Sequence, residues 1–329
     1  MKRGNRTGAL TGALLAAAVT LGPACIAAAA EGLPAKPVRM VTALPAGADA
    51  YVRVLAARFS EQVGQPVVVE NRPGAAFVNA ARAVSGAPAD GATVLIYSLM
   101  FLIVKNVQPS LAFDPIADFT PVAKIYGDGA SMLLVRPESP LRSVQELIGQ
   151  AKASPGKLTH GGQVAASAHL NAASFLAVAG VKGFHIPYKG ATDEIAALLR
   201  GDVDFTFMAT TVALPYVVSG KLRALGVTSA ARVRPLPDVP TLREVLKNDL
   251  LVQDNWSGLA VPAKTPAEVV ARWHAETVKA LGDPLLLKAI EAGGNQPGAG
   301  ESPEQFAAFA RRENDKWRDI VKLTGIKVD

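Results

Sequence analysis

Cysteine is nearly absent from this chain, since Cys25 is the only one in 329 residues. It lies in an N-terminal segment with the features of a leader, so the rest of the chain can form no disulfide and offers no thiol nucleophile. Stability must therefore come from apolar cores. Residues 31–329 are long enough for two domains of ordinary size.

The leader begins with Lys2, Arg3 and Arg6 and continues as an uncharged run from Ala9 to Ala30. A short positive stretch followed by an apolar run with small residues at its end is typical of a secretory signal peptide. The sequence therefore predicts a signal peptide over residues 1–30, cleaved before Glu31.

Two other interpretations of the leader stay open. The run is long enough to span a membrane as an uncleaved helix, although its many alanines, Gly22 and Pro23 favour cleavage. Cys25 is also a position for a lipid anchor. However, Gly22 stands three residues earlier, where such a site wants leucine or a branched side chain.

The sharper catalytic signatures are missing as well. After the leader there is no G-x-S-x-G elbow, P-loop or H-E-x-x-H helix. The four histidines, His160, His169, His185 and His274, have no spacing typical of a metal site. Ser167 and His169 are two positions apart, which does not bring two side chains together on a helix. The sequence thus predicts no enzyme, no metal and no cofactor.

Strong charge of one sign is also lacking. The formal charge is +6, and it falls to +3 once the three cations of the leader are set aside. The sequence contains no run of basic residues that would predict binding to nucleic acid. A weak positive field would suit an anionic ligand, or it would simply keep the protein soluble.

What the chain does have is a regular alternation of short apolar runs with amphipathic segments. VRMVT at 38–42 precedes a helical pattern over 49–63, and VVVE at 67–70 precedes another over 75–85. The same rhythm recurs after residue 130. This alternation is typical of α/β domains with mostly parallel strands, so two such units in series are predicted.

Helix starts are marked by four pairs at the spacing of a capping box, in which each side chain satisfies the other residue's amide. The pairs are Ser143 with Glu146, Thr241 with Glu244, Thr265 with Glu268, and Ser302 with Gln305. Pro266 and Pro303 would occupy first helical positions. The last third is therefore predicted as two long helices, 266–281 and 303–323, with little strand between them.

Small and polar residues follow several of the predicted strands. In open α/β sheets ligands bind beyond the carboxyl ends of the strands. A helix that begins there presents backbone amides and a partial positive charge, which can hold a carboxylate without a side-chain cation. Binding therefore fits the sequence better than catalysis. The segments concerned are 44–49, 97–100, 161–167, 187–193 and 208–211.

Seven segments, taken together and in order, resemble the Bug family, the periplasmic solute receptors of tripartite tricarboxylate transporters. They cover essentially the whole chain after the leader, and each alone would be a weak signal. The segments are EQVGQPVVVENRPGA (61–75), APADGATVL (87–95), FDPIADFTPVA (113–123), IPYKG (186–190), SGKLRALGVTSAAR (219–232), LPDVPTLRE (236–244) and GLAVPAKTPAEVVARWHAE (258–276).

This resemblance implies an α/β fold of two lobes, the type II periplasmic-binding-protein fold, which closes on a small organic acid. Lobe 1 would comprise residues 31–129 plus 252–329, and lobe 2 residues 130–251. The expected partners are the acid and the membrane subunits of a tripartite transporter, and the expected form is a monomer in the periplasm. A sensor that reports ligand to a membrane signalling protein is the alternative, because it needs the same fold.

The resemblance also implies that the ligand lies against the loops that follow the strands. The implied site residues are Leu44, Pro45, Ala46, Gly47, Asp49, Ser98, Leu99, Met100, Gln163, Val164, Ala165, Ala166, Ser167, His169, Tyr188, Met208, Ala209 and Thr210. The corner Glu70-Asn71-Arg72-Pro73-Gly74 belongs to the loops of lobe 1. There a structural turn is favoured over direct ligand contact.

Several positions depart from the pattern usual in the family. Ala46 stands for a glycine in a shortened first loop, Leu99 and Met100 replace glycine and threonine, and Met208 stands where aspartate is common. Each change removes polarity, and a ligand polar group buried without a partner costs about 1–3 kcal/mol. A ligand with an apolar or aromatic body is therefore expected. The other interpretation is that Leu99, Met100 and Met208 point into the lobe cores.

Overall fold

Apart from Met1, the computed structural model describes residues 33, 35–44, 49–72, 77–163, 167–292 and 295–326. The predicted signal peptide, its cleavage site and Cys25 lie outside these ranges. Within the described ranges, no helix combines the length and the apolar character needed to cross a membrane.

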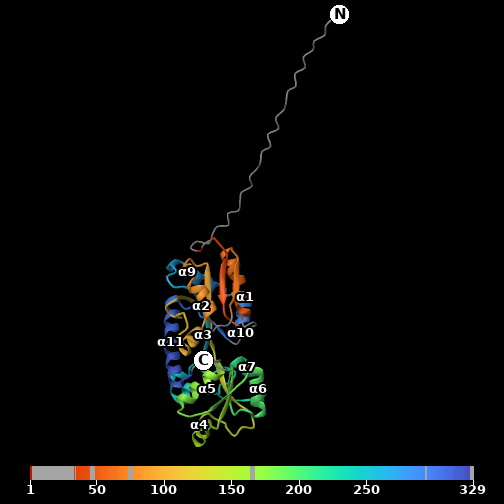
Figure 1. Ribbon diagram of the computed structural model, residues 1–329. Coiled ribbons are helices and arrows are strands. Elements are labelled where there is room, and N and C mark those ends of the chain that lie inside the picture. Colours follow the sequence, from red (N-terminus) through yellow and green to blue (C-terminus); the bar gives the residue numbers. More distant parts are fainter. Residues whose placement is uncertain are drawn as a thin grey trace.

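The chain folds into two lobes stacked end to end (Figure 1), which confirms the predicted two-lobed α/β class. Lobe 1 contains a six-stranded sheet of order β11-β4-β10-β3-β1-β2. Its strands are β1 (Val38–Thr42), β2 (Val67–Asn71), β3 (Thr93–Ser98), β4 (Phe119–Gly129), β10 (Asn255–Pro262) and β11 (Gln296–Pro297). Its helices are α1 (Ala50–Val63), α2 (Val78–Ser85), α3 (Leu99–Val107), α9 (Ala267–Ala280), α10 (Pro284–Ala292) and α11 (Pro303–Thr324).

Lobe 2 contains a three-stranded sheet of order β8-β5-β9 and a two-stranded sheet of β6 and β7. Its strands are β5 (Ser131–Val135), β6 (Thr159–Gly162), β7 (Phe184–Pro187), β8 (Thr206–Ala209) and β9 (Arg223–Val227). Its helices are α4 (Val144–Ala153), α5 (Ser167–Val178), α6 (Ala191–Arg200), α7 (Thr210–Val218), α8 (Leu242–Leu246) and the short 3-10 helix η2 (Asp249–Leu251).

The prediction of mostly parallel strands is wrong. β1 is parallel to β2 and β3, and β6 is parallel to β7. However, β10 runs antiparallel to β3 and β4, and β5 runs antiparallel to β8 and β9. The cause is the crossing between lobes: β3 ends at the boundary, whereas β10 begins there and runs away from it. An apolar run in the sequence carries no information on strand direction.

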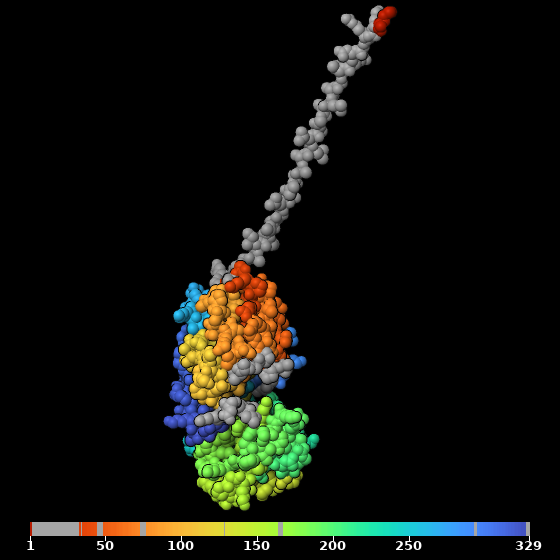
Figure 2. Space-filling view, viewed as in Figure 1, coloured from red at the N-terminus to blue at the C-terminus, as the bar shows by residue number. Residues whose placement is uncertain are grey.

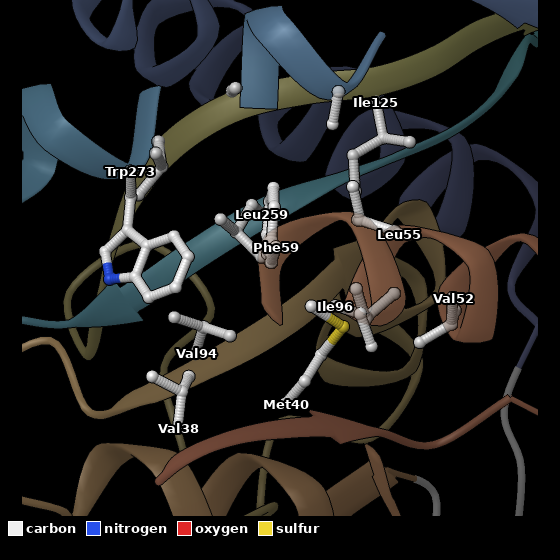
Figure 3. Packing of buried hydrophobic residues seen from close by; sticks show 14 of the residues in the cluster. Val38, Met40, Val52, Leu55, Phe59, Val94, Ile96, Ile125, Leu259 and Trp273 are labelled. Carbon is white, nitrogen blue, oxygen red and sulfur yellow. The ribbon is translucent and has the colours of Figure 1, made fainter. Parts of the chain in front are cut away.

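One core of lobe 1 forms where α1 and α9 cover one face of the sheet (Figure 3). Met40, Leu55, Phe59 and Trp273 are fully buried in it. The indole of Trp273 donates a 2.9 Å hydrogen bond to the carbonyl of Gly91, so its one polar atom is satisfied. Burial of each of these large side chains stabilises the folded protein by roughly 1.5–3 kcal/mol. This core therefore holds the sheet that carries the cleft residues.

Two of the four predicted capping boxes form in full, and a third forms in part, because the Glu146 side chain accepts from the amide of Arg142 and not from that of Ser143. Ser143 accepts from the amide of Glu146, and full capping boxes form at Thr241 and Ser302. The Thr265 cap is wrong, because its hydroxyl donates to the carbonyl of Pro262 at 2.7 Å and α9 begins two residues later. The segment between the long helices also holds α10 and β11, which the sequence analysis did not predict.

The chain segments that cross between the two lobes are hydrogen-bonded to one another. The Thr228 hydroxyl accepts from the amide of Ser131 at 2.9 Å and donates to the carbonyl of Gln253 at 2.9 Å, while the amide of Gln253 donates to the carbonyl of Thr228 at 3.0 Å. These bonds tie the outgoing chain at 131 to the returning chain at 253. We propose that the boundaries between the lobes lie near residues 129/130 and 251/252.

Helix α11 runs alongside both lobes (Figure 1). Its Trp317 and Ile320 pack in the same buried cluster as Leu170, which lies on α5 of lobe 2. Lys316 donates to the carbonyl of Val252 at 2.8 Å, at the returning crossing. The helix therefore ties the crossing and the α5 end of lobe 2 to lobe 1.

Candidate ligand-binding cleft

A cavity of about 330 Å³ lies between the lobes, where the molecule is hollowed in the space-filling view (Figure 2). It is lined from lobe 1, lobe 2, the crossings and α11. The lining residues are Leu44, Ser98, Leu99, Met100, Ile103, Tyr126, Gly129, Ala130, Ser131, Ser167, Asn171, Ala209, Thr210, Thr211, Gln253, Asp254, Asn255, Asn295 and Trp317.

Three helix N-termini meet at this cavity. Helix α3 begins directly after Ser98 at the end of β3, and α7 begins at Thr210 directly after β8. Helix α5 begins at Ser167. Each N-terminus offers backbone amides and a partial positive charge. No Lys, Arg or His is among the described residues that line the cavity, so these termini are its source of positive potential.

Buried polar atoms without a hydrogen-bond partner gather among the lining residues. Ser98 is 4% exposed, and its hydroxyl makes no cap bond to α3 and no other hydrogen bond. The Gln253 side-chain oxygen and the Trp317 indole nitrogen are likewise buried and unpartnered. Such atoms are uncommon in native interiors because each costs about 1–3 kcal/mol. A polar ligand bound in the cavity could supply the hydrogen-bond partners that these atoms lack.

Seven of the predicted site residues line the cavity. They come from the first loop, the α3 start, the α5 start and the α7 start, and they are Leu44, Ser98, Leu99, Met100, Ser167, Ala209 and Thr210. Six others lie outside the described residues, namely Pro45, Ala46, Gly47, Val164, Ala165 and Ala166.

The remaining five predicted residues are not among the lining residues. Asp49 is 5% exposed and accepts a 2.9 Å bond from Arg53. Met208 is 5% exposed and packs in a core of lobe 2, so it points into the core. Tyr188 packs beside the same core, Gln163 is exposed, and His169 lies in a ring stack described below.

Leu99 and Met100 combine both roles that the sequence left open. They line the cavity and also contact the apolar cluster under α3, where Leu99 is 6% exposed. The segment 97–100, predicted as a loop, instead consists of the last two residues of β3 joined directly to the first two residues of α3. This junction presents both side chains at the cavity wall.

Several lining residues were missed. Ile103 and Asn171 lie four positions after Leu99 and Ser167, so the helical repeat of one face was the signal that could have found them. Asn295 and Trp317 had no such signal, because they reach the cavity only through the packing of the C-terminal segment. The crossing residues Gln253, Asp254 and Asn255 were missed as well.

The polar corner after β2 is structural within its described part. Arg39 donates to Glu70 at 2.6 and 3.0 Å, Arg72 also pairs with Glu70, and these bonds hold the pKa of Glu70 below its usual value. Asn71 donates to the carbonyl of Leu44 at 3.0 Å. None of these side chains lines the cavity, but Asn71 holds a residue that does.

Three histidines stack behind the start of α5. The His169 and His185 ring centroids are 3.9 Å apart, and the His160 and His185 centroids 5.1 Å apart. The His185 ring nitrogen is 2.9 Å from the carbonyl of Gly162. Burial, reinforced by the neighbouring rings, lowers the pKa of His160 to about 3 and that of His169 to about 4. Among the described residues no group of three or more His, Cys, Asp or Glu is placed to hold a metal ion.

A second, larger cavity of about 750 Å³ lies beside the first. The two share Ala130, Thr210, Thr211, Asp254 and Asn295, so they are neighbouring parts of one groove between the lobes. The larger part is bordered by Arg232 and Arg234 of lobe 2 and Glu291 of lobe 1, among others. Of the three helix N-termini only that of α7 borders it, so the smaller cavity is the candidate ligand site.

Known proteins are similar to this chain over nearly its whole length. The family described as tripartite tricarboxylate transporter family receptor matches residues 51–326. Protein BugT of Bordetella pertussis (strain Tohama I) is 32% identical over 304 residues, 91% of this chain and 92% of that protein.

Solved structures agree with this similarity. Rpa4515 of R. palustris, solved with adipate, is 30% identical with a TM-score of 0.71, over 89% of this chain and 99% of that one. MatC (Rpa3494) of Rhodopseudomonas palustris, solved with bound malate, is 26% identical with a TM-score of 0.69, over 88% and 100%. The predicted periplasmic-binding-protein fold is thereby confirmed.

Proposed function

Because this chain belongs to the Bug family of tripartite tricarboxylate transporter receptors, we propose that it captures a small organic acid between its lobes for delivery to the transporter's membrane subunits. Receptors of this family are periplasmic and bind small carboxylates. The proposed form of this chain is a monomer, released into the periplasm after cleavage of residues 1–30. Its role is binding without turnover of the ligand.

The observation that carries this proposal is the meeting of three helix N-termini at one cavity that has no cation among its described lining residues. A carboxylate is the ligand group that such termini favour. Ser98 stands at the first of them with a buried hydroxyl that lacks a partner. We therefore place the ligand carboxylate at the Ser98 hydroxyl and the first amides of α3.

The body of the ligand is proposed to be apolar or aromatic. Leu44, Leu99, Met100 and Ile103 form an apolar part of the wall, and Met100 can adapt to different shapes. Adipate and malate, bound by two relatives, show the size that related clefts accept. Binding contacts to both lobes would favour the closed arrangement, because a ligand shifts an equilibrium only by its difference in affinity for the two states.

The first test is a thermal-shift panel on the chain from residue 31. Aliphatic dicarboxylates, aromatic carboxylates, amino acids and nicotinate-like acids are compared at equal concentration. A ligand at a hundred times its Kd stabilises by about 2.7 kcal/mol, a clear rise in midpoint. We expect selective stabilisation by acids with an aromatic or long apolar body. A response to short polar dicarboxylates alone would contradict the apolar wall, and no response to any acid would contradict the receptor function.

Replacing Ser98 by alanine tests where the carboxylate lies. The variant removes a buried hydroxyl that has no partner, so the ligand-free protein should keep its stability or gain up to about 1 kcal/mol. Affinity for the best acid should fall about ten- to a hundredfold, since a hydrogen bond to a charged group contributes about 1.5–3 kcal/mol. Isothermal titration measures the affinity and denaturant unfolding the stability.

Ser174→Ala is the matched control. Its hydroxyl donates to the carbonyl of Leu170 at 2.7 Å, is fully buried and does not line the cavity. This variant should lower stability and leave affinity unchanged. If Ser98→Ala behaves like Ser174→Ala, Ser98 is not a ligand residue.

A further inference from the structure

Two of the buried polar atoms that lack a partner at the cavity are complementary to each other. The indole nitrogen of Trp317 can only donate a hydrogen bond, and the side-chain oxygen of Gln253 can only accept one. Trp317 is 2% exposed and Gln253 is 5% exposed, and both residues line the cavity of about 330 Å³. An unpaired donor and an unpaired acceptor are thus buried at the same cavity, and each is unfavourable until a partner arrives.

The Gln253 side chain is fixed with its oxygen left over. Its side-chain nitrogen donates to the carbonyl of Leu250 at 2.9 Å, and its backbone amide donates to the carbonyl of Thr228 at 3.0 Å. The side-chain amide cannot turn over without losing the bond to Leu250. The group that Gln253 offers to a ligand is therefore an acceptor.

The segments that carry the two atoms are in contact. Lys316, which precedes Trp317 in α11, donates to the carbonyl of Val252, which precedes Gln253, at 2.8 Å. Trp317 and Gln253 nevertheless make no hydrogen bond to each other. A cavity of about 330 Å³ is at the lower end of the range for ligand sites, about 300–1,000 Å³. A small acid bound in it therefore lies near both side chains.

Few ligand groups can pair with both atoms. A carboxylate only accepts, so it would satisfy Trp317 and leave the Gln253 oxygen facing another acceptor. An ammonium only donates, so it would satisfy Gln253 and leave the indole N–H unpaired. A hydroxyl group both donates and accepts, and it is small enough to lie between two side chains.

We propose that the ligand is a hydroxy acid whose hydroxyl group accepts from Trp317 Nε1 and donates to Gln253 Oε1, while its carboxylate lies at the helix N-termini. This inference rests on the proposed function and narrows its ligand class. Trp317 and Gln253 then select the hydroxy acid over the same acid without the hydroxyl. Such selection is strong because the analogue leaves the buried groups of the site unpaired.

The first test compares acids that share one carbon skeleton and differ only in a hydroxyl group. The pairs are butanoate with 3-hydroxybutanoate, hexanoate with 6-hydroxyhexanoate, benzoate with 3-hydroxybenzoate, and succinate with malate. Titration calorimetry on the chain from residue 31 gives each Kd. In at least one pair the hydroxy acid should bind at least tenfold more tightly than the plain acid. The comparison uses the unaltered protein, so no folding defect can confuse it.

Nuclear magnetic resonance observes the donor itself. The chain has three tryptophans, so a nitrogen-15-labelled sample gives three indole N–H signals. The Trp273 indole already donates to the carbonyl of Gly91, and the Trp256 indole is buried and unpartnered but belongs to no residue of the cavity lining. The hydroxy acid should move the Trp317 signal downfield, and the plain acid should move it less. The signals of Trp256 and Trp273 should be the same with both acids.

Trp317→Phe and Trp256→Phe form a matched pair of variants. Each removes a buried indole whose nitrogen has no partner, and only Trp317 lines the cavity. Both variants should lower the stability of the protein. Trp317→Phe should also reduce the preference for the hydroxy acid over the plain acid at least threefold, and Trp256→Phe should leave this ratio of Kd values unchanged. A merely structural role of Trp317 would not change the ratio.

Four outcomes would overturn the inference. If both members of every pair bind equally and move the Trp317 signal equally, a carboxylate takes the indole N–H. If the hydroxy acid is preferred but the Trp317 signal stays in place, the hydroxyl group binds elsewhere. If no hydroxy acid binds while other acids of the thermal panel do, the proposed function stands without this refinement. If no acid of any kind binds, the proposed function falls with it.

Discussion

The purified chain should lose stability as the pH falls from about 6.5 to 4, because the unfolded state then binds protons at histidines that are buried and neutral in folded lobe 2. His160 is 3% exposed, and burial beside two other imidazoles lowers its pKa to about 3. In the unfolded chain a histidine binds its proton near pH 6.5. Between these values the unfolded state binds more protons, so stability falls with falling pH. At about 1.4 kcal/mol per pH unit, His160 alone costs on the order of 3 kcal/mol by pH 4.

Glu194 acts in the opposite direction on the other side of β6. It is 3% exposed, accepts from the Thr206 hydroxyl, and burial raises its pKa from 4.5 to about 7. Between these values the folded state binds the extra proton. Its contribution is therefore present below about pH 4.5 and is lost as the pH rises through 7. In the window from 4.5 to 6.5 it partly hides the loss caused by His160.

Denaturant unfolding between pH 8 and 4 separates the two groups. His160→Gln should flatten the loss on the acid side by about 1 kcal/mol per pH unit, whatever its stability at neutral pH. Glu194→Gln should steepen the acid loss and raise relative stability at pH 8. His274→Gln is the control, since His274 lies in α9 outside the stack. An unchanged acid slope in His160→Gln would show that the stack does not govern acid stability.

The parts of the fold that local sequence patterns predicted are those set by local physical chemistry. Ser143, Thr241 and Ser302 cap helices because their side chains satisfy amides only three residues away. Thr265 failed because its hydroxyl had a competing acceptor, the carbonyl of Pro262. The prediction of strand direction was wrong because the direction of each strand is set by where the chain crosses between the lobes, and not by the strand's own residues.

The residues of the candidate site also differ in whether local sequence patterns could predict them. Leu44, Ser98 and Thr210 were predictable because they lie at or just beyond the ends of strands that reach the boundary between the lobes. Met208 was not, because β8 is covered on both faces: Phe207 packs in one core and Met208 in the other. On a strand that is covered on both faces, polar and apolar residues do not alternate, so the sequence pattern cannot show which side chains point into a core. The position of Met208 at the end of a strand therefore suggested a site residue.

The wall contributed by Trp317 depends on contacts between distant segments. Asn314 bonds to Asn106 across 208 residues, at a hydrogen-bond distance of 3.0 Å, and this contact helps to seat α11 against α3. Nothing in the local sequence around Trp317 distinguishes it from a core tryptophan. Its role at the cavity follows from how the C-terminal helix packs on the rest of the chain.

Gly258→Ala should destabilise the protein by about 3 kcal/mol, because there is no room for a methyl group at this position in β10. An added Cβ would lie 2.6 Å from the carbonyl oxygen of Ala123 and still closer to the ring of Phe306. The carbonyl belongs to β4, which pairs with β10, so it cannot move without breaking the sheet. The Phe306 ring is 1% exposed and is packed against Tyr97 and Trp256.

The same substitution at Gly149 is the matched control. Gly149 lies inside α4, and an added Cβ there would meet nothing within 4 Å. Gly149→Ala should therefore stabilise the protein by roughly 0.5–1 kcal/mol, the usual gain when alanine replaces glycine in a helix. Denaturant unfolding at pH 7.5 measures both variants. A loss below about 1 kcal/mol in Gly258→Ala would mean that both the Phe306 ring and the β4 backbone at Ala123 adjust to the added methyl group, which would contradict the prediction.

A second variant shows whether the clash reaches the cleft. Phe306 lies in the first turn of α11, and the same helix carries Trp317 to the cavity. If Gly258→Ala displaces α11 through the ring, adding Phe306→Leu should restore part of the lost stability, because contacting residues couple by about 0.5–3 kcal/mol. It should also restore ligand affinity lost in the single variant. Recovery of stability without recovery of affinity would show that the position of α11 does not control the cavity wall.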